Sequence, residues 1–485
     1  MKTLKHISAF LLLVPLLASC HFLEVEKTGK TSIKNFYSDI YALDAAVNGV
    51  YGLTYKFYDN YMVLYPEVAG DMVRLQATTS DWRQQFDFIS DESDETTAVG
   101  YIWKNGYEII ANANEVIQYG PSVSDRFPQQ TASVRNYIAQ AYFIRALIHL
   151  DLSLVYGQTY TYSADGSHLG TAVMTTIPDV KSKIARSSAA VSYKRILDDL
   201  RTASDMFADG WTKGCYYASP AACKALMARV YLYMGNYSES KKCASEVIAD
   251  YGLSLTPRSD YVAMFCARKE GQEAIFRLNG LSGGYKLGAM FDYNSPSMNP
   301  SSKLMDIFSS DEHVWTGTDV RSELLSYKSS GGDVFSGVCM KFTDTEDIDD
   351  TQKRYDPFVL RLSEMYLIRA EAACHDGDIE TAVSDIATLE ARARGVKASD
   401  INVVYSNAEE LDRIIRRERV KELFLEGHRL FDLTRRHETL SRDAACGSSV
   451  LSMTYPDDRF ILPVPLVELD ANEAMQPNPI NGTQR

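Results

Sequence analysis

Two stretches of the chain combine aromatic rings with polar side chains, a combination that suits the binding of sugars. A ring stacks on the apolar face of a pyranose, while carboxylates, amides and guanidinium groups bond its hydroxyls. The first stretch, Asp71–Phe88, contains Asp71, Arg74, Gln76, Trp82, Arg83 and Gln84. The second, Gly283–Trp315, contains Tyr285, Phe291, Asp292, Tyr293, Asn294 and Trp315. We predict that a ligand site uses Asp71, Arg74, Trp82, Tyr285, Tyr293 and Trp315. The alternative is that Trp82 and Trp315 pack beneath their own loops.

Cys20 is a candidate for covalent modification. Residues 1–19 begin with Lys2 and Lys5, continue with an apolar run and end in small residues, which is typical of an export signal. The run is too short to span a membrane. Leu17-Ala18-Ser19-Cys20 matches the bacterial lipobox. We predict that residues 1–19 are a lipoprotein signal peptide and that acyl chains on Cys20 anchor the protein. The alternative is a secretory signal followed by a chance cysteine.

Patterns typical of enzymes are absent from the sequence or incomplete. There is no HExxH, GxSxG or GxGxxG, and Ser238–Lys241 matches SxxK without an accompanying SDN. His428 has no second metal ligand nearby in the sequence. Nothing among the 64 acidic residues marks the carboxylate pair that a glycosidase needs. We therefore predict that the chain is not an enzyme, uses no cofactor and has no zinc or catalytic metal site.

Seven cysteines remain after Cys20, an odd number, and the sequence contains no CxxC motif. They are Cys215, Cys223, Cys243, Cys266, Cys339, Cys374 and Cys446. The pattern indicates neither a disulfide framework nor a zinc site.

The most highly charged stretch is Glu409–Arg436, which we predict to be one helix. From Val420 onward its apolar residues follow the spacing of one helix face. Spacings of three or four would place Glu418 opposite Lys421, Glu426 opposite Arg429, and Asp432 opposite Arg435 and Arg436. The interleaved signs favour a structural helix that forms ion pairs with its neighbours over a basic groove for an anionic ligand.

The amino-acid sequence of this predicted helix resembles that of the hallmark helix of the SusD/RagB family. The members of this family are nutrient-binding outer-membrane lipoproteins of Bacteroidetes-type bacteria. The matching residues are Arg417-Glu418-Arg419, Glu422-Leu423, Glu426-Gly427-His428-Arg429 and Phe431-Asp432-Leu433. Other segments resemble the family in the same order: Ala46–Tyr51, Trp103 with Tyr107, Ile110 and Asn114, Ile461–Pro465, and Gln476–Pro479. Glu24 and Glu26 resemble the surface-export tag of such lipoproteins.

The resemblance implies a function and a partner. It implies a lipid-anchored outer-membrane protein, facing the cell exterior, that captures an oligosaccharide and delivers it to a SusC-like TonB-dependent transporter. A peptide ligand, a surface glycosidase and a purely structural surface protein remain alternatives. The net charge of -14 disfavours nucleic acid and anionic headgroups, so we expect no nucleic acid partner and membrane contact through the lipid anchor only.

The scaffold is predicted to be mostly α. Helices are expected over 32–58, 101–119, 133–156 and 192–207, followed by helical hairpins over Pro220–Tyr251 and Val359–Leu389. Each hairpin has a glycine at its turn, Gly235 or Gly377, and small residues near the helix crossing, which resembles tetratricopeptide repeats. Such a unit cannot bury its apolar face alone, so we predict about four stacked helical pairs.

We predict one domain over residues 20–485. Its helical scaffold covers 32–255 and 355–440, a loop-rich insertion covers 256–357, and an extended tail covers 441–485. Within the insertion, Ala274–Leu278 and Val338–Phe342 are predicted to be short strands. Long loops on a rigid scaffold commonly carry function.

Overall fold

The computed structural model of the protein describes residues 33–179, 181–267, 271–280, 286–309, 317–329, 331–343 and 355–478. Cys20, Tyr285 and Trp315 lie outside these residues, so the predictions made for them remain predictions. The predicted domain boundaries also remain predictions.

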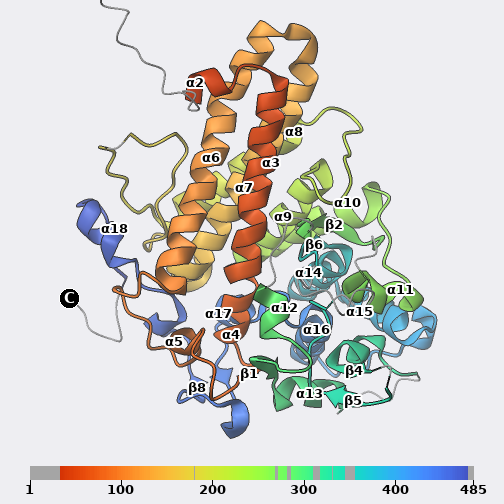
Figure 1. Cartoon of the computed structure of the whole chain (residues 1–485). Coiled ribbons are helices and arrows are strands. Elements are labelled where there is room, and N and C mark those ends of the chain that lie inside the picture. The colour runs from red at the N-terminus through yellow and green to blue at the C-terminus, as the bar shows by residue number, and fades with distance from the viewer. Residues whose placement is uncertain are drawn as a thin grey trace, which may run out of the picture.

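The first part of the chain forms a layer of four long helices (Figure 1). They pack in the order α3 (Ile40–Phe57), α6 (Ala98–Arg126), α7 (Thr131–Tyr156) and α8 (Ala189–Met206). The side chains of Asp39, Thr97 and Ser188 accept an early amide of α3, α6 and α8, as N-cap residues do. The four predicted helices are confirmed, except that the first, expected over 32–58, is divided into α2 (Ile33–Phe36) and α3, which Asp39 caps.

Helix α7 is the most extensively buried of this layer. Among the described residues, Pro128–Tyr156 is the one helix long and apolar enough to cross a membrane, but 89% of its most apolar window is buried inside the protein. Helices α6 and α8 pack on it from either side. The apolar character of α7 is therefore explained by its place at the centre of the layer.

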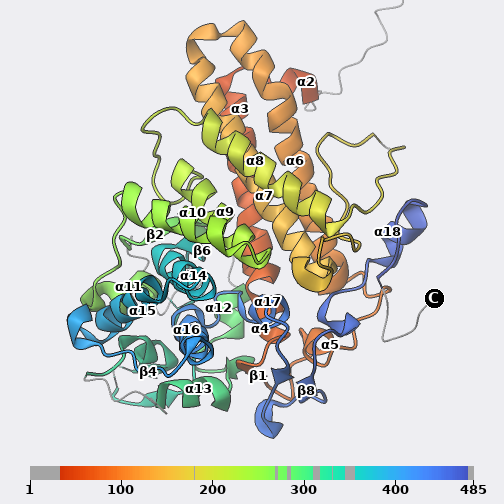
Figure 2. The same cartoon turned by 180° about the vertical axis from the view of Figure 1, so that it is seen from behind.

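Shorter helices in hairpins follow, and lie beside the long ones (Figure 2). They are α9 (Pro220–Tyr233), α10 (Tyr237–Asp250), α14 (Leu362–His375) and α15 (Ile379–Arg394), with α16 (Ala408–Leu423) packed on α14. Gly235 (φ 70°) and Gly377 (φ 80°) take the left-handed backbone that ends the first helix of each pair. Asn236 and Asp378 then cap the second helix. The predicted tetratricopeptide-like scaffold of helical pairs is confirmed.

The strands are short and pair antiparallel, β1 with β3, β2 with β6, β4 with β5 and β7 with β8. Their bounds are Val73–Leu75 (β1), Ala274–Arg277 (β2), Met298–Pro300 (β3), Ser326–Lys328 (β4), Val334–Ser336 (β5), Phe358–Arg361 (β6), Leu440–Ser441 (β7) and Ser452–Met453 (β8). The short helices are α2 (Ile33–Phe36), α4 (Leu64–Val68), α5 (Arg83–Phe86), α11 (Arg258–Cys266), α12 (Lys286–Met290), α13 (Ser302–Ser309), α17 (Arg429–Arg435) and α18 (Leu466–Ala471).

One strand prediction is confirmed and one is wrong. Strand β2 falls within the predicted Ala274–Leu278. The segment Val338–Phe342 is buried but irregular. The Met340 amide bonds the Leu324 carbonyl of a helical turn, and the Lys341 ammonium reaches the Glu426 carboxylate, 2.6 Å away. The side chains of Val338–Phe342 are therefore apolar because the segment is buried, and not because it pairs as a strand.

The charged stretch Glu409–Arg436 is not one helix, which corrects the prediction. Helix α16 ends at Leu423, and α17 begins at Arg429. Between them Leu425 (φ 59°) and Gly427 (φ 89°) are left-handed, and a Cβ on Gly427 would lie 2.8 Å from the Met62 carbonyl oxygen. The buried Glu67 carboxylate accepts the amides of Gly427 and His428 at 2.9 and 3.0 Å, so it stabilises the break. Burial raises the pKa of Glu67 to about 7.

The ion pairs predicted along this stretch are partly confirmed. Asp432 pairs with Arg435 at 2.8 Å. Glu426 lies outside both helices and pairs with Arg361 and Lys341 instead of Arg429. The prediction of a structural element that forms ion pairs with its neighbours is correct in kind, but most partners are distant in sequence.

Glu418, Lys421 and Glu422 of α16 belong to a buried ionic network. Its basic members are Arg321, Lys341, Arg361, Arg392, Arg394 and Lys421, and its acidic members are Glu273, Asp319, Glu390, Glu418, Glu422 and Glu426. Burial and the charge of neighbouring Glu390 raise the pKa of Glu418. The network joins α15, α16 and β6 to the insertion.

Arg321→Met tests this network. Arg321 is fully buried and faces Asp319, Glu390, Glu418 and Glu422, so its loss leaves buried carboxyl groups without their cation. We expect the free energy of unfolding to fall by about 3–5 kcal/mol in urea titrations. Arg413→Met is the matched control, because the pair of Arg413 with Glu410 on α16 is solvent-exposed, and it should cause no measurable change. Equal stability of the two variants would contradict the role given to the network.

Candidate functional site

The loop that carries Trp82 is held in a strained backbone. Helix α5 lies between Trp82 (φ 67°) and Phe88 (φ 54°), both in the left-handed region. Bulky residues seldom adopt this conformation, which costs roughly 1–3 kcal/mol at each position. It persists only where the surroundings hold it, and such positions cluster at functional sites.

Arg442 of the C-terminal tail holds this loop in place. Its buried guanidinium donates to the carbonyl oxygens of Val68 (2.9 Å), Gly70 (2.8 Å) and Phe86 (2.6 Å), and it lies 4.4 Å from the centre of the Phe86 ring. Burial lowers the pKa of Arg442 to about 10. The tail therefore fixes the loop to the end of α4, although 356 residues separate Arg442 from Phe86.

A cavity of about 620 Å³ opens between this loop, the end of α3 and the start of α6. It is lined by Asn60, Tyr61, Ser80, Asp81, Trp82, Arg83, Gln84, Gln85, Thr96, Thr97, Ala98, Tyr101 and Lys286, and we call it the Trp82 cavity. The centre of the Tyr61 ring lies 6.4 Å from that of Trp82 and 6.1 Å from that of Tyr101. Trp82 is only 9% exposed, whereas Tyr101 is 38% exposed. Tyr101 therefore offers the most open ring to a ligand.

Tyr61 lies in a π-helical turn, Tyr58–Met62, that continues α3. Such turns are rare and are frequent at functional sites. The Tyr58 hydroxyl donates to the buried Asp151 carboxylate at 2.9 Å, which ties the turn to α7. Burial raises the pKa of both Tyr61 and Asp151, the latter to about 7.

The polar rim is organised by Asp59 of the same turn. Its carboxylate accepts the Tyr355 hydroxyl and, at 3.4 Å, the amides of Lys286 and Leu287 at the start of α12. Lys286 then reaches Asp81 at 2.6 Å on the cavity rim. Charged and amide groups thus lie beside the rings, which is the arrangement that bonds sugar hydroxyls while a ring stacks on the sugar face.

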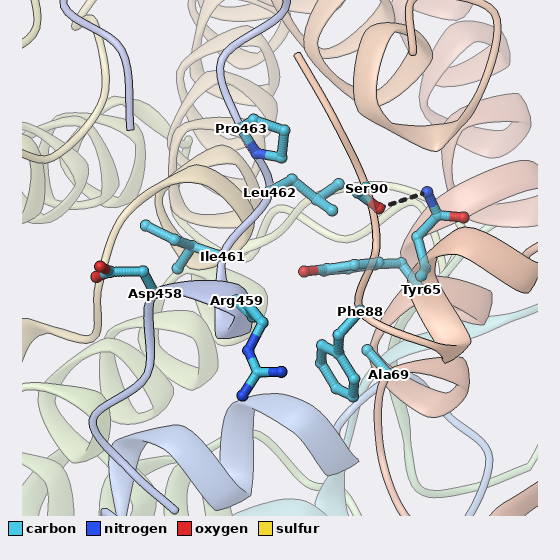
Figure 3. A pocket seen from close by; sticks show the side chains of 10 residues that line it. Tyr65, Ala69, Phe88, Ser90, Asp458, Arg459, Ile461, Leu462 and Pro463 are labelled. Atoms are coloured by element: carbon cyan, nitrogen blue, oxygen red, sulfur yellow. Dashed lines mark hydrogen bonds between the residues drawn. The ribbon is translucent and has the colours of Figure 1, made fainter. Parts of the chain in front are cut away.

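A second, much smaller cavity is shown in Figure 3. It measures about 20 Å³ and is lined by Tyr65, Ala69, Gln85, Phe88, Ser90, Asp458, Arg459, Ile461, Leu462 and Pro463. Gln85 lines both cavities, and its amide donates to the Ser90 hydroxyl at 3.0 Å. This volume suits a water molecule and not a sugar ring, so the small cavity is not a ligand site.

The predicted site residues do not all meet. Trp82 lines the cavity and is 9% exposed, and its role in binding remains a prediction. Arg74 is exposed on β1 and does not line it, and Tyr293 packs against Tyr327 and Phe335 at 4.3 and 5.6 Å. Lys286, which follows Tyr285 in the chain, does line it.

Asp71 is not available to a ligand, which corrects its place among the predicted residues. Its buried carboxylate lies 2.6 Å from both Arg429 and Lys303. Although burial opposes ionisation, these two cations hold the pKa of Asp71 at about 2. Asp71 therefore ties α17 to the loop after α4.

Tyr61 and Tyr101, which both line the Trp82 cavity, were not among the site residues predicted from the sequence. The signal for Tyr101 lies in its helix: Ile102, Trp103 and Gly106 are buried, whereas Tyr101 and Lys104 point away from that apolar face. A large aromatic residue on the polar face of an amphipathic helix is a candidate contact. Tyr61 carried no comparable signal, because its environment depends on the π-helical turn.

Arg442→Met tests how the loop is held. The substitution leaves buried carbonyl groups without a donor, so we expect the free energy of unfolding to fall by about 3 kcal/mol or more in urea titrations. Amide hydrogen exchange across residues 82–90 should also rise. Arg413→Met is again the control, because the pair of Arg413 with Glu410 on α16 is solvent-exposed, and it should leave exchange in the loop unchanged. Unchanged exchange in Arg442→Met would show that the loop is held by other contacts.

Comparison with known proteins covers nearly the whole chain. Residues 273–480 match the model of the SusD family, and residues 21–232 match a SusD-like model described as starch-binding associating with outer membrane. SusD-like protein P2 of Formosa agariphila is 24% identical over 98% of this chain and 99% of its own length. SusD-like protein P38 of the same organism is 24% identical over 91% of this chain and 93% of its own.

Solved structures share the fold. A SusD superfamily protein from Bacteroides thetaiotaomicron superposes with a TM-score of 0.79 at 24% identity, covering 91% of this chain and all of that one. A SusD-like carbohydrate binding protein from Bacteroides vulgatus superposes with a TM-score of 0.69 at 19% identity, over 90% of this chain and 97% of that one. These structures show the shared fold, and the two SusD-family models, which between them match residues 21–232 and 273–480, show that the chain belongs to the SusD/RagB family.

Proposed function

We propose that the protein is a cell-surface lipoprotein that binds an oligosaccharide in the Trp82 cavity and passes it to a SusC-like TonB-dependent transporter of the outer membrane. The observation that carries the proposal is the cluster of Tyr61, Trp82 and Tyr101 in one cavity with a polar rim. The family, whose second matching model is described as starch-binding, supports a glycan as the ligand class.

The chemistry of the cavity supports binding without bond cleavage. A glycosidase needs two carboxyl groups that flank the scissile bond. Of the described residues that line the Trp82 cavity, Asp81 alone carries a carboxylate, and it is paired with Lys286. Rings and hydrogen-bonding groups suffice for capture, because stacked aromatic rings lose little entropy when a ligand binds.

The binding site is tested with a glycan and peptide array and the soluble chain that begins after Cys20. We expect selective glycan binding, and we expect Tyr101→Ala to weaken it roughly 10- to 100-fold, since a buried aromatic contact contributes about 1.5–3 kcal/mol. Trp82→Ala should weaken it as well. Tyr41→Ala is the matched control, because Tyr41 on α3 is 82% exposed and does not line the cavity, and it should bind like the parent protein.

Other outcomes of the array assign the alternatives. Binding to peptides alone would make the protein a peptide-binding member of the family. Shortened glycan products after incubation would indicate a glycosidase. Glycan binding that Tyr101→Ala and Trp82→Ala leave intact would place the site elsewhere.

The anchor and the partner are tested together in outer membranes. We expect labelled palmitate on the parent protein and on Cys215→Ser but not on Cys20→Ser, because the lipobox cysteine is the acylated residue. Cys215 is a partly exposed cysteine outside the lipobox and serves as the matched control. The parent protein should co-purify with a TonB-dependent barrel after detergent extraction. The absence of any barrel would count against the transporter as partner.

A further inference from the structure

A third cavity adjoins the Trp82 cavity at Tyr101, which lines both. It measures about 710 Å³ and is formed by α6, by the loop before α8 and by the segment that contains α18. Its described lining includes Trp103, Tyr107, Met174, Ile184, Val467 and Ala471, and we call it the α18 cavity. Tyr101 and Thr96 line both cavities.

The floor of the α18 cavity is aromatic and well supported. The Trp103 ring lies 4.8 Å from Tyr107 and 5.0 Å from Tyr156, measured between ring centres. The Trp103 indole N–H points to Glu468 at 3.4 Å, and the Tyr107 hydroxyl donates to the Ala172 carbonyl at 2.9 Å. Trp103 is only 5% exposed and supports Tyr107 from below, so the half-buried Tyr107 ring is the aromatic surface that a ligand can contact.

The wall opposite α6 is clamped in place. The Lys183 ammonium donates to the Ala471 carbonyl, and the Asn472 amide donates to the Ile184 carbonyl at 2.9 Å. Arg186 bonds Asn478 at 2.6 Å farther along the tail. These contacts join the loop to the tail, so the cavity has a bonded wall and is not simply a gap beneath a helix.

We propose that the ligand is a linear glycan longer than the Trp82 cavity can hold, and that it crosses Tyr101 into the α18 cavity, which binds its further sugar residues. This inference rests on the proposed function. Ala98 lines the first cavity and Tyr107 the second, and nine residues of helix separate them, about 14 Å along α6. Rings at the floor and charged groups at the rim, Lys104 and Glu95, suit sugar faces and hydroxyls as in the first cavity.

The test is calorimetric titration with a size-graded ladder, disaccharide to octasaccharide, of the glycan that binds best on the array. For the parent protein, we expect the dissociation constant to fall at least tenfold once the chain outgrows the first cavity. Ala471→Trp should abolish that gain and leave the affinity for the shortest binding oligomer unchanged, because Ala471 is exposed and its enlarged side chain fills only the α18 cavity. Val467→Trp, at a 54% exposed position of the same wall, should do the same.

Ala471→Ser is the control, since it keeps the space open and should retain the gain with length. Affinity that does not depend on length in the parent protein would overturn the inference and leave the proposed function standing. So would a gain that survives in both tryptophan variants, or an equal loss for short and long oligomers. Failure of the parent protein to bind any glycan would instead overturn the proposed function.

Discussion

The structure depends on a set of buried charges that stabilise one another. Arg361 touches Glu273, Glu422 and Glu426, and Arg392 touches Glu273 and Glu422. Buried charges are costly unless all their partners are in place, so these contacts strongly disfavour any other arrangement of α15, α16 and the insertion. The helical scaffold and the irregular insertion therefore form one body, and the insertion can present Lys286 at the rim of the cavity.

The candidate site is assembled from segments far apart in the chain. Glu67 fixes the break between α16 and α17, Asp71 ties Arg429 to the loop after α4, and Arg442 holds the strained loop around α5. The hallmark charged stretch thus acts from behind the site, through the backbone that carries the rings. A residue there can change binding without touching a ligand, because it sets the position of the loop.

The two larger cavities share one ring, and this gives Tyr101 a particular position. A ligand confined to the Trp82 cavity would contact Tyr101 from that cavity alone, whereas a longer chain would contact Tyr101 from both cavities. When one ligand contacts both cavities, the second set of contacts raises its affinity at little further cost. The ligand loses its translational and rotational entropy only once. A capture protein built in this way would favour long chains over the short products that surround them.

The sequence by itself determined the helical scaffold and the family. Apolar periodicity, the caps and the turn glycines Gly235 and Gly377 are local signals, and each predicted helix of the long layer and each hairpin was found close to its predicted position. The amino-acid sequence of the hallmark stretch Glu409–Arg436 identified the family. It also suggested a single helix, which was wrong because the break at Leu425 and Gly427 depends on Glu67, far away in the sequence. The aromatic and polar composition of Asp71–Phe88 likewise indicated Trp82 as a candidate site residue.

Only the tertiary structure showed that Asp71 is held by Arg429 and Lys303, that Tyr293 packs against a hairpin, and that Tyr61 and Tyr101 face one cavity. The physical reason is that helix formation is decided by neighbours within a few residues, whereas exposure of a side chain at a site is decided by whichever distant segments pack around it.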